Sequence, residues 1–192
     1  MAYVEKLVQE TDAGRCVGIQ IINNTRDMTL ENPRTYCFSG SAMIDPVPQI
    51  PPGSSESFLF KKTSYTARGS VGVLSYESAA FTLAIMFSNP FDRFLYSIEF
   101  AIELFAGRTH FHNMERLYHY MYGHNPPYKC ESFQKTMLTD DQDGQLEVTN
   151  QEIQVKATMS NKKKSIIKVQ IEQGDRCPSD AAHSASLEST QN

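Results

Sequence analysis

The chain has 192 residues, a net charge of −4 and an isoelectric point near 5.7. This length suits one domain, since domains usually hold roughly 100–200 residues, and a chain of this size can fold without a disulfide or metal. The acidic balance lacks the basic surface of nucleic-acid-binding proteins, so we expect no nucleic-acid partner. The four cysteines are widely separated, without a C-x-x-C pair, and are expected to be reduced thiols.

Neither a secretory signal nor a membrane-spanning segment is recognisable. Residues 1–6 lack the charged flank and apolar run of a signal peptide. No window approaches the roughly 20 apolar residues of a spanning helix, because the best candidates, 81–87 and 94–105, are too short or carry glutamates. We therefore expect a soluble protein that is cytoplasmic by default or is released by a non-classical route.

The first half of the chain predicts a short helix followed by strands. Residues 2–11 carry a narrow apolar stripe, typical of an amphipathic helix. From residue 15 the apolar period changes to two, as in half-buried strands. The segment 39–55 is rich in proline and is expected to be largely loop. The strands predicted in this half cover residues 17–21, 35–38, 57–60 and 70–76.

A hairpin and a second helix are predicted next. The segments 80–88 and 94–105 alternate apolar and polar residues around an Asn-Pro-Phe-Asp turn, which indicates an antiparallel hairpin with one buried face. Apolar residues then recur at helical spacing over 111–122. Strands resume near 133–138. A closing hairpin over 153–171 completes a mainly β fold, a β-sandwich with one or two short α-helices packed on its faces.

These patterns divide the chain into three parts. Residues 1–14 form a short N-terminal segment with helical patterning, and residues 15–173 form the sandwich domain. Residues 174–192 are rich in Ser and Ala and carry one large aliphatic side chain, so we expect a disordered tail.

Four histidines and one cysteine lie between residues 110 and 130, but their spacing matches no metal-binding or nucleophile motif. A zinc site needs about four converging ligands, and no fixed spacing supplies them here. Residues 139–144 resemble the start of a calcium loop, but Asn150 replaces the bidentate glutamate, which favours an acidic hairpin loop. We expect no enzymatic activity, no metal and no cofactor. The candidate ligands are His110, His112, His119, His124 and Cys130.

The basic triplet Lys162-Lys163-Lys164 falls on a predicted turn. Such runs are usually solvated loop tips, although three cations could add a few kcal/mol of attraction to an anionic membrane. The triplet alone does not decide between these interpretations.

Aromatic residues gather around the central hairpin and the second helix. Tyr118 and Tyr122 are four residues apart and project from the same helical face. Tyrosine rings can hold a quaternary ammonium group over their π-faces, and their hydroxyls can donate to a phosphate. The alternative is that about half of these rings are simply core. The residues alone leave both interpretations open.

Four segments resemble the actinoporins, the pore-forming cytolysins of sea anemones, which have relatives in other lineages, fish among them. The resemblance spans roughly residues 15–173, and this chain looks closer to the vertebrate and fish branch. It implies a β-sandwich flanked by two helices, a site for phosphocholine headgroups with sphingomyelin as the favoured lipid, and oligomeric cation-conducting pores that cause haemolysis. The matching segments are Gly69–Tyr76, Phe81–Asp92, Leu95–Ser97 and Leu117–Tyr122.

The family's headgroup site can be carried over residue by residue. By this resemblance, Tyr96, Tyr118 and Tyr122 would cage the choline. Ser88 and the tyrosine hydroxyls would hold the phosphate. The complete predicted site is Val71, Ser88, Pro90, Tyr96, Tyr118 and Tyr122.

The sequence also departs from the family pattern. It has no tryptophan, and Leu95, Glu99 and Phe100 occupy positions where the family has rings. Gly123 replaces a second tyrosine after Tyr122. A helix of 14 residues would span about 21 Å, less than the roughly 30 Å hydrocarbon core. We therefore expect membrane binding to be better preserved than lysis.

The expected partners are membrane lipids with phosphocholine headgroups, above all sphingomyelin, and further copies of the chain on the membrane. The protein would then be peripheral on a target cell membrane when active. Two alternatives remain open. One is a carbohydrate-binding module, because fungal fruit-body lectins share this sandwich. The other is a non-lytic intracellular interaction protein.

Overall fold

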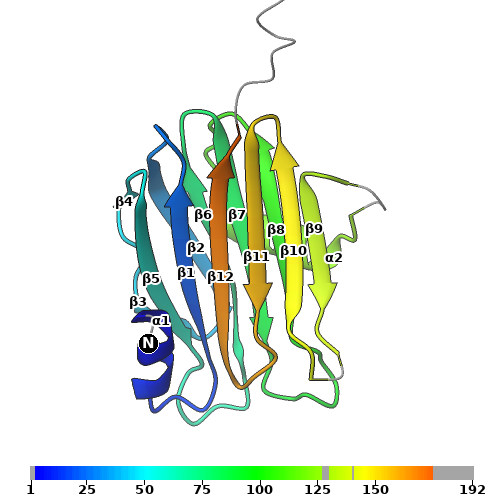
Figure 1. Ribbon diagram of the computed structural model, residues 1–192. Helices are drawn as coiled ribbons and strands as arrows, with labels where there is room; N and C mark the ends of the chain where they lie inside the picture. The colour runs from blue at the N-terminus through cyan, green and yellow to red at the C-terminus, as the bar shows by residue number, and fades with distance from the viewer. Residues whose placement is uncertain (1–2, 127–129, 140, 175–192) are drawn as a thin grey trace, which may run out of the picture.

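The computed structural model describes residues 3–126, 130–139 and 141–174. The described part of the chain forms two helices and twelve strands (Figure 1). The elements are α1 (Tyr3–Glu10), β1 (Cys16–Asn24), β2 (Leu30–Ser39), β3 (Ser41–Ile44), β4 (Gln49–Ile50), β5 (Ser54–Lys61), β6 (Ser70–Glu77), β7 (Phe81–Asn89), β8 (Glu99–Ala106), α2 (Met114–Gly123), β9 (Phe133–Met137), β10 (Gly144–Asn150), β11 (Ile153–Met159) and β12 (Lys164–Gln173).

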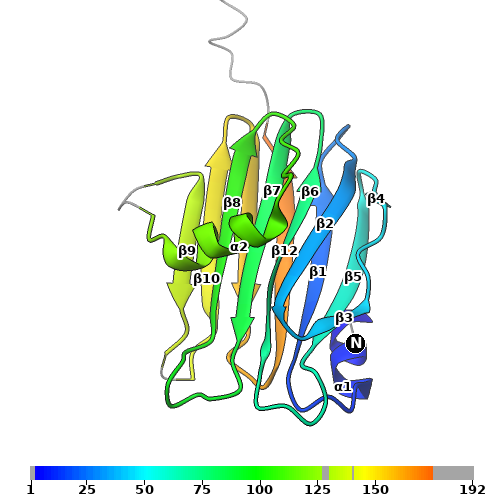
Figure 2. The same cartoon turned by 180° about the vertical axis from the view of Figure 1, so that it is seen from behind.

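Two six-stranded sheets pack face to face. The first has the strand order β10-β11-β12-β1-β5-β3, and the second has the order β4-β2-β6-β7-β8-β9. Strands β1 and β12 pair in parallel, and the other pairings are antiparallel. Figure 2 shows α2 crossing the outer face of the second sheet, and α1 beside one end of the first. The predicted β-sandwich with two short helices is confirmed.

The main core lies between the sheets. The predicted alternation in β1 is confirmed, because Val17, Ile19 and Ile21 are fully buried there. Phe58 and Phe60 of β5 join them from the neighbouring strand. Period-two patterning therefore decides which face of the first sheet points inward.

A second apolar layer lies between the second sheet and α2. Met114, Leu117 and Met121 of the helix pack on Val73 and Met86 of the strands beneath. Every residue of β7 and the first six residues of β8 are consequently buried. The prediction of one buried face for the central hairpin is therefore wrong, since the helix covers the other face.

The first helix packs on the outer face of the first sheet. Val4 and Val8 are buried there, while Glu5 pairs with Lys168 of β12 at 2.5 Å. The contact needs a glycine in β1, because a Cβ on Gly18 would lie 2.5 Å from a methyl of Val8. The close packing of α1 on β1 therefore depends on the glycine at position 18.

Several element boundaries differ from the sequence-based expectations. The segment 39–55 contains β3 and β4, which are short edge strands formed by pairing with β5 and β2. The predicted strand over 94–105 begins only at Glu99, because 92–96 form a turn in which Tyr96 N donates to Asp92 O. Strand β10 was not predicted.

Parts of the predictions fall outside the described residues, namely Asp140 of the calcium-like segment, Cys177, and residues 175–192 of the expected tail. Within the described residues, no helix combines the length and the apolar character needed to cross a membrane.

Candidate functional site

A cavity of about 720 Å³ opens on the outer face of the second sheet, beside α2. Strands β2, β6 and β7 supply its floor, α2 supplies one wall, and the loop after β7 supplies another. The structure brings all six residues of the predicted site into its lining: Val71, Ser88, Pro90, Tyr96, Tyr118 and Tyr122.

The floor is a cross-strand row near the ends of the strands. Val71 of β6 pairs with Ser39 of β2 on one side and with Ser88 of β7 on the other. Gly69 lets the strand ends meet, because a Cβ there would lie 2.1 Å from the carbonyl oxygen of Asn89. The floor is therefore fixed by backbone pairing and not by adaptable side chains.

The wall on the α2 side is a stack of aromatic rings. Tyr118 and Tyr122 lie 5.6 Å apart with an angle of 28° between their planes. On the other side of Tyr118, Phe38 of β2 stacks at 5.3 Å and 19°. Tyr118 is only 2% exposed and is the innermost ring, whereas Tyr96 is 55% exposed at the opening. The cavity therefore offers both enclosed and accessible aromatic surface to a ligand.

The tyrosines of this wall are kept protonated. Burial raises the pKa of Tyr118 well above its usual value, and Tyr122 and Glu99 nearby act in the same direction. Burial also raises the pKa of Tyr122. A tyrosine is already protonated at neutral pH, and the raised pKa values keep both hydroxyls as hydrogen-bond donors into the alkaline range.

An ion pair supports Tyr122 from behind. The ammonium group of Lys135 on β9 donates to the carbonyl oxygen of Tyr122, lies 5.4 Å from its ring centroid, and is 3.8 Å from the Glu99 carboxylate. The side chains of Lys135 and Glu99 are 9% and 10% exposed. Burial raises the pKa of Glu99 although Lys135 opposes this. Glu99 is thus buried beside Lys135 and Tyr122 and does not face solvent.

A second carboxyl lies beneath the other side of α2. Glu103 is 8% exposed, and its Oε1 accepts a hydrogen bond from the Tyr120 hydroxyl at 3.2 Å. Its Oε2 is buried without a hydrogen-bond partner. Burial raises the pKa of Glu103 to about 7. The layer between helix and sheet therefore holds two carboxyls with raised pKa values.

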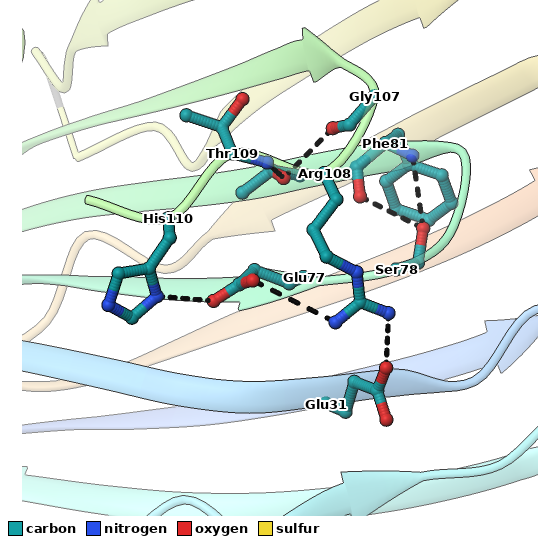
Figure 3. Close-up of polar contacts among 9 residues, drawn as sticks. Glu31, Glu77, Ser78, Phe81, Gly107, Arg108, Thr109 and His110 are labelled. Atoms are coloured by element: carbon teal, nitrogen blue, oxygen red, sulfur yellow. Dashed lines mark hydrogen bonds and ion pairs between the residues drawn. The ribbon is translucent and has the colours of Figure 1, made fainter.

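A polar cluster holds the loop that leads into α2, at the end of the second sheet opposite the cavity (Figure 3). Glu77 is buried, and its carboxylate lies 3.1 Å from His110 Nδ1 and 3.8 Å from the Arg108 guanidinium. Arg108 also pairs with Glu31 of β2. At the start of α2, the Asn113 side chain accepts from the N–H of Arg116. These contacts fix where the helix begins and hence where its tyrosines lie.

The candidate metal ligands do not form a metal site. His110 is bound to Glu77, and His124 stacks on Tyr120 at 5.5 Å. Among the described residues, no group of three or more His, Cys, Asp or Glu side chains could hold a metal ion. Cys16, Cys37 and Cys130 are free thiols.

Sequence reasoning missed several lining residues, notably Tyr36, Phe38 and Arg68. Tyr36 and Phe38 are two positions apart on a strand and therefore share a face, a signal that the sequence did contain. Arg68 comes from the loop before β6, and no local pattern places it beside the helix.

Comparison with known proteins places the chain in a family. The family described as sea anemone cytotoxic protein matches residues 4–173. The chain belongs to this family. The match confirms the resemblance to actinoporins, and the family description agrees with the expectation that the protein is not an enzyme. The expected closeness to the fish branch stays a prediction.

Several curated proteins are similar to this chain over part of their length. DELTA-alicitoxin-Pse1b of Phyllodiscus semoni is 34% identical over 111 residues, which is 56% of this chain and 47% of that protein. Cytolysin tenebrosin-B of Actinia tenebrosa is 34% identical over 113 residues, covering 58% of this chain and 52% of the cytolysin. Bryoporin of Physcomitrium patens is 39% identical over 89 residues, covering 44% and 49%. The chain thus spans about half the length of the curated relatives it matches.

Among solved structures, the lipid-binding protein Nakanori superposes with a TM-score of 0.67. The superposition covers 88% of this chain and 76% of Nakanori at 16% identity. At this identity the likeness supports the fold alone.

Proposed function

We propose that the protein binds membrane lipids and recognises their phosphocholine headgroups, those of sphingomyelin above all, in the cavity beside α2. One observation carries the proposal. The six residues that the family resemblance selected from distant parts of the chain line a single cavity. Family membership favours this function over the lectin and interaction-protein alternatives.

The chemistry of the lining suits a zwitterion. A choline group would lie against the exposed ring of Tyr96 and the ring of Tyr122, since a cation over an aromatic face gains about 0.5–2 kcal/mol. The phosphate would accept hydrogen bonds from Ser88 and the tyrosine hydroxyls. Arg68 adds a cation to the lining on the side of the β5–β6 loop.

Pore formation is the second part of the proposal. Bound copies would assemble on the membrane and conduct cations, which would lyse red cells. The names of the relatives, a cytolysin and several toxins, support this step. The eight residues of α1 span only about 12 Å, however, which is less than the roughly 30 Å core of a bilayer. We therefore place headgroup binding before permeabilisation.

Co-sedimentation with vesicles tests the proposal. Wild-type protein should bind sphingomyelin-containing vesicles better than vesicles of phosphatidylethanolamine, a lipid that lacks choline and carries no net charge. Tyr96→Ala should weaken this binding without unfolding the protein, because Tyr96 is 55% exposed. Tyr3→Ala is the matched control, as Tyr3 is 61% exposed on α1 and lies outside the cavity lining.

Dye release from the same vesicles reports permeabilisation separately. Failure to bind any choline lipid would refute headgroup recognition. Binding to glycans that survives both Tyr96→Ala and Tyr122→Ala would support the carbohydrate-binding alternative instead.

A further inference from the structure

The last turn of α2 takes a hydrogen-bond donor from outside the helix. Carbonyl groups at the end of a helix have no partner within it, and the residue four positions after Tyr122 is Pro126, which has no N–H. The ammonium group of Lys135 donates to the Tyr122 carbonyl from β9, over which this end of the helix lies (Figure 2). A cation at this place also interacts favourably with the partial negative charge of the helix C-terminus.

The same ammonium group contacts the ring of Tyr122. It lies 5.4 Å from the ring centroid, within the range of a cation–π contact. The Lys135 side chain is only 9% exposed, so the protein around it restricts the positions that it can take. Tyr122 is therefore held at its backbone and at its ring by one side chain that is itself fixed by burial.

Glu99 provides the counter-charge for this lysine. A buried ammonium group without an opposite charge would be strongly destabilising. The Glu99 carboxylate lies 3.8 Å from the Lys135 ammonium group, and its side chain is 10% exposed. The two residues belong to neighbouring strands, because Glu99 of β8 pairs with Met137, two positions beyond Lys135 on β9. The second sheet therefore fixes both charges, and the end of α2 is bound to them.

The two tyrosines of the cavity wall are held in different ways. Tyr118 lies one turn earlier in α2, is 2% exposed and contacts two aromatic rings of β2. Tyr122 is only partly buried, and it is followed by Gly123, where an added Cβ would meet no atom. Packing therefore fixes Tyr118, whereas the place of Tyr122 in the wall depends on Lys135.

A choline group depends on the position of an aromatic ring more than an ethanolamine group does. A quaternary ammonium group has no N–H, so the protein holds it mainly against aromatic faces. A primary ammonium group has three N–H donors and is more strongly hydrated. It can bind an acceptor instead, such as the carboxylate of Asp92 in the cavity lining. A correctly placed Tyr122 ring therefore favours choline over ethanolamine.

We propose that the buried pair of Lys135 and Glu99 sets the preference of the cavity for choline over ethanolamine headgroups, because it holds the ring of Tyr122 against the ligand. Lys135 is a positioning residue, since it acts through Tyr122 and is not part of the cavity lining. Glu99 acts one step further away, as the counter-ion of the lysine. This inference rests on the proposed headgroup site.

Nuclear magnetic resonance titrations with phosphocholine and phosphoethanolamine measure the preference without a membrane. The deciding variant is Lys135→Met/Glu99→Gln, which removes both charges together and leaves neither one buried alone. Its affinity for phosphocholine should fall about 2- to 30-fold, the range of one cation–π contact, while its affinity for phosphoethanolamine should change little. Contacts between the choline methyl protons and the Tyr122 ring should weaken, and those with Tyr96 should remain. Partial unfolding would instead lower both affinities alike.

Tyr120→Phe is the matched control. It removes another contact between α2 and a buried carboxyl, that of Glu103, and it lies outside the cavity lining. This variant should keep the wild-type preference. The proposal would be overturned by an unchanged preference in the double variant, by a loss of the same size in Tyr120→Phe, or by equal affinity of the wild type for the two compounds. A wild type that binds neither compound would refute headgroup recognition as well, so the two failures are distinguishable.

Discussion

Replacing Glu103 by glutamine should remove a pH-dependent part of the protein's stability. Burial raises the pKa of this carboxyl from 4.5 to about 7. The folded protein therefore holds a proton that the unfolded chain has released, and the stabilisation is complete below pH 4.5 and is lost as the pH rises to about 7. At 1.36 kcal/mol per pKa unit, the raised value corresponds to about 3 kcal/mol between acidic and alkaline pH.

The variant Glu103→Gln keeps an oxygen that can accept from Tyr120 and carries no charge at any pH. Its free energy of unfolding relative to wild type should therefore increase by about 3 kcal/mol between about pH 4.5 and pH 8. Urea unfolding followed by far-ultraviolet circular dichroism measures this, since the chain has no tryptophan for fluorescence. Glu131→Gln, at an exposed position just before β9, is the control and should show no such trend.

A constant difference between Glu103→Gln and wild type over this pH range would refute the reasoning. It would mean that water reaches the carboxyl in the folded protein and that the layer beneath α2 does not shift its pKa.

Three further changes test other parts of the structure. Gly69→Ala should lower both the melting temperature and binding to sphingomyelin vesicles, because its Cβ would meet backbone atoms; Gly123→Ala, which has open space around it, should be tolerated. Lys135→Met should cost about 3–5 kcal/mol in urea unfolding by leaving the Glu99 carboxylate uncompensated, and adding Glu99→Gln should recover part of the loss. Gly18→Leu should displace α1, which limited proteolysis would detect as faster cleavage within the first ten residues.

Sequence patterning correctly predicted the elements that bury one face against one neighbouring layer. The alternation at Val17, Ile19 and Ile21 identifies a strand with one face on the core, and the spacing over 111–122 identifies α2. The pattern of apolar and polar residues predicted the wrong exposure in β8, because α2 packs on the outer face of the second sheet as a third layer. Glu99 and Glu103 marked a solvent face in the sequence, yet α2 covers them. Lys135 pairs with Glu99, and Tyr120 donates a hydrogen bond to one oxygen of Glu103.

Short edge strands were the other failure. The β3 strand, Ser41–Ile44, has a weak pattern of its own and exists because β5 offers it hydrogen bonds. Such pairing depends on which strand is next in space, and a local window of sequence does not contain that information.

The candidate site followed from the family resemblance more than from local chemistry. The tyrosine spacing on α2 showed that Tyr118 and Tyr122 share a face, but it did not show that this face meets Val71 and Ser88 of the sheet. The spacing of Tyr36 and Phe38 placed them on one face of a strand, but only the structure shows that both rings meet Tyr118.

The pairing of β1 with β12 has a consequence for how the chain folds during synthesis. Their paired residues, such as Asn24 and Glu172, are separated by 148 positions. One edge of β1 therefore stays open until almost the whole described chain has left the ribosome. Long-range pairing of this kind slows folding and exposes intermediates to aggregation. We expect nascent chains that lack β12 to depend on chaperones, and the first sheet to close only after β12 has left the ribosome.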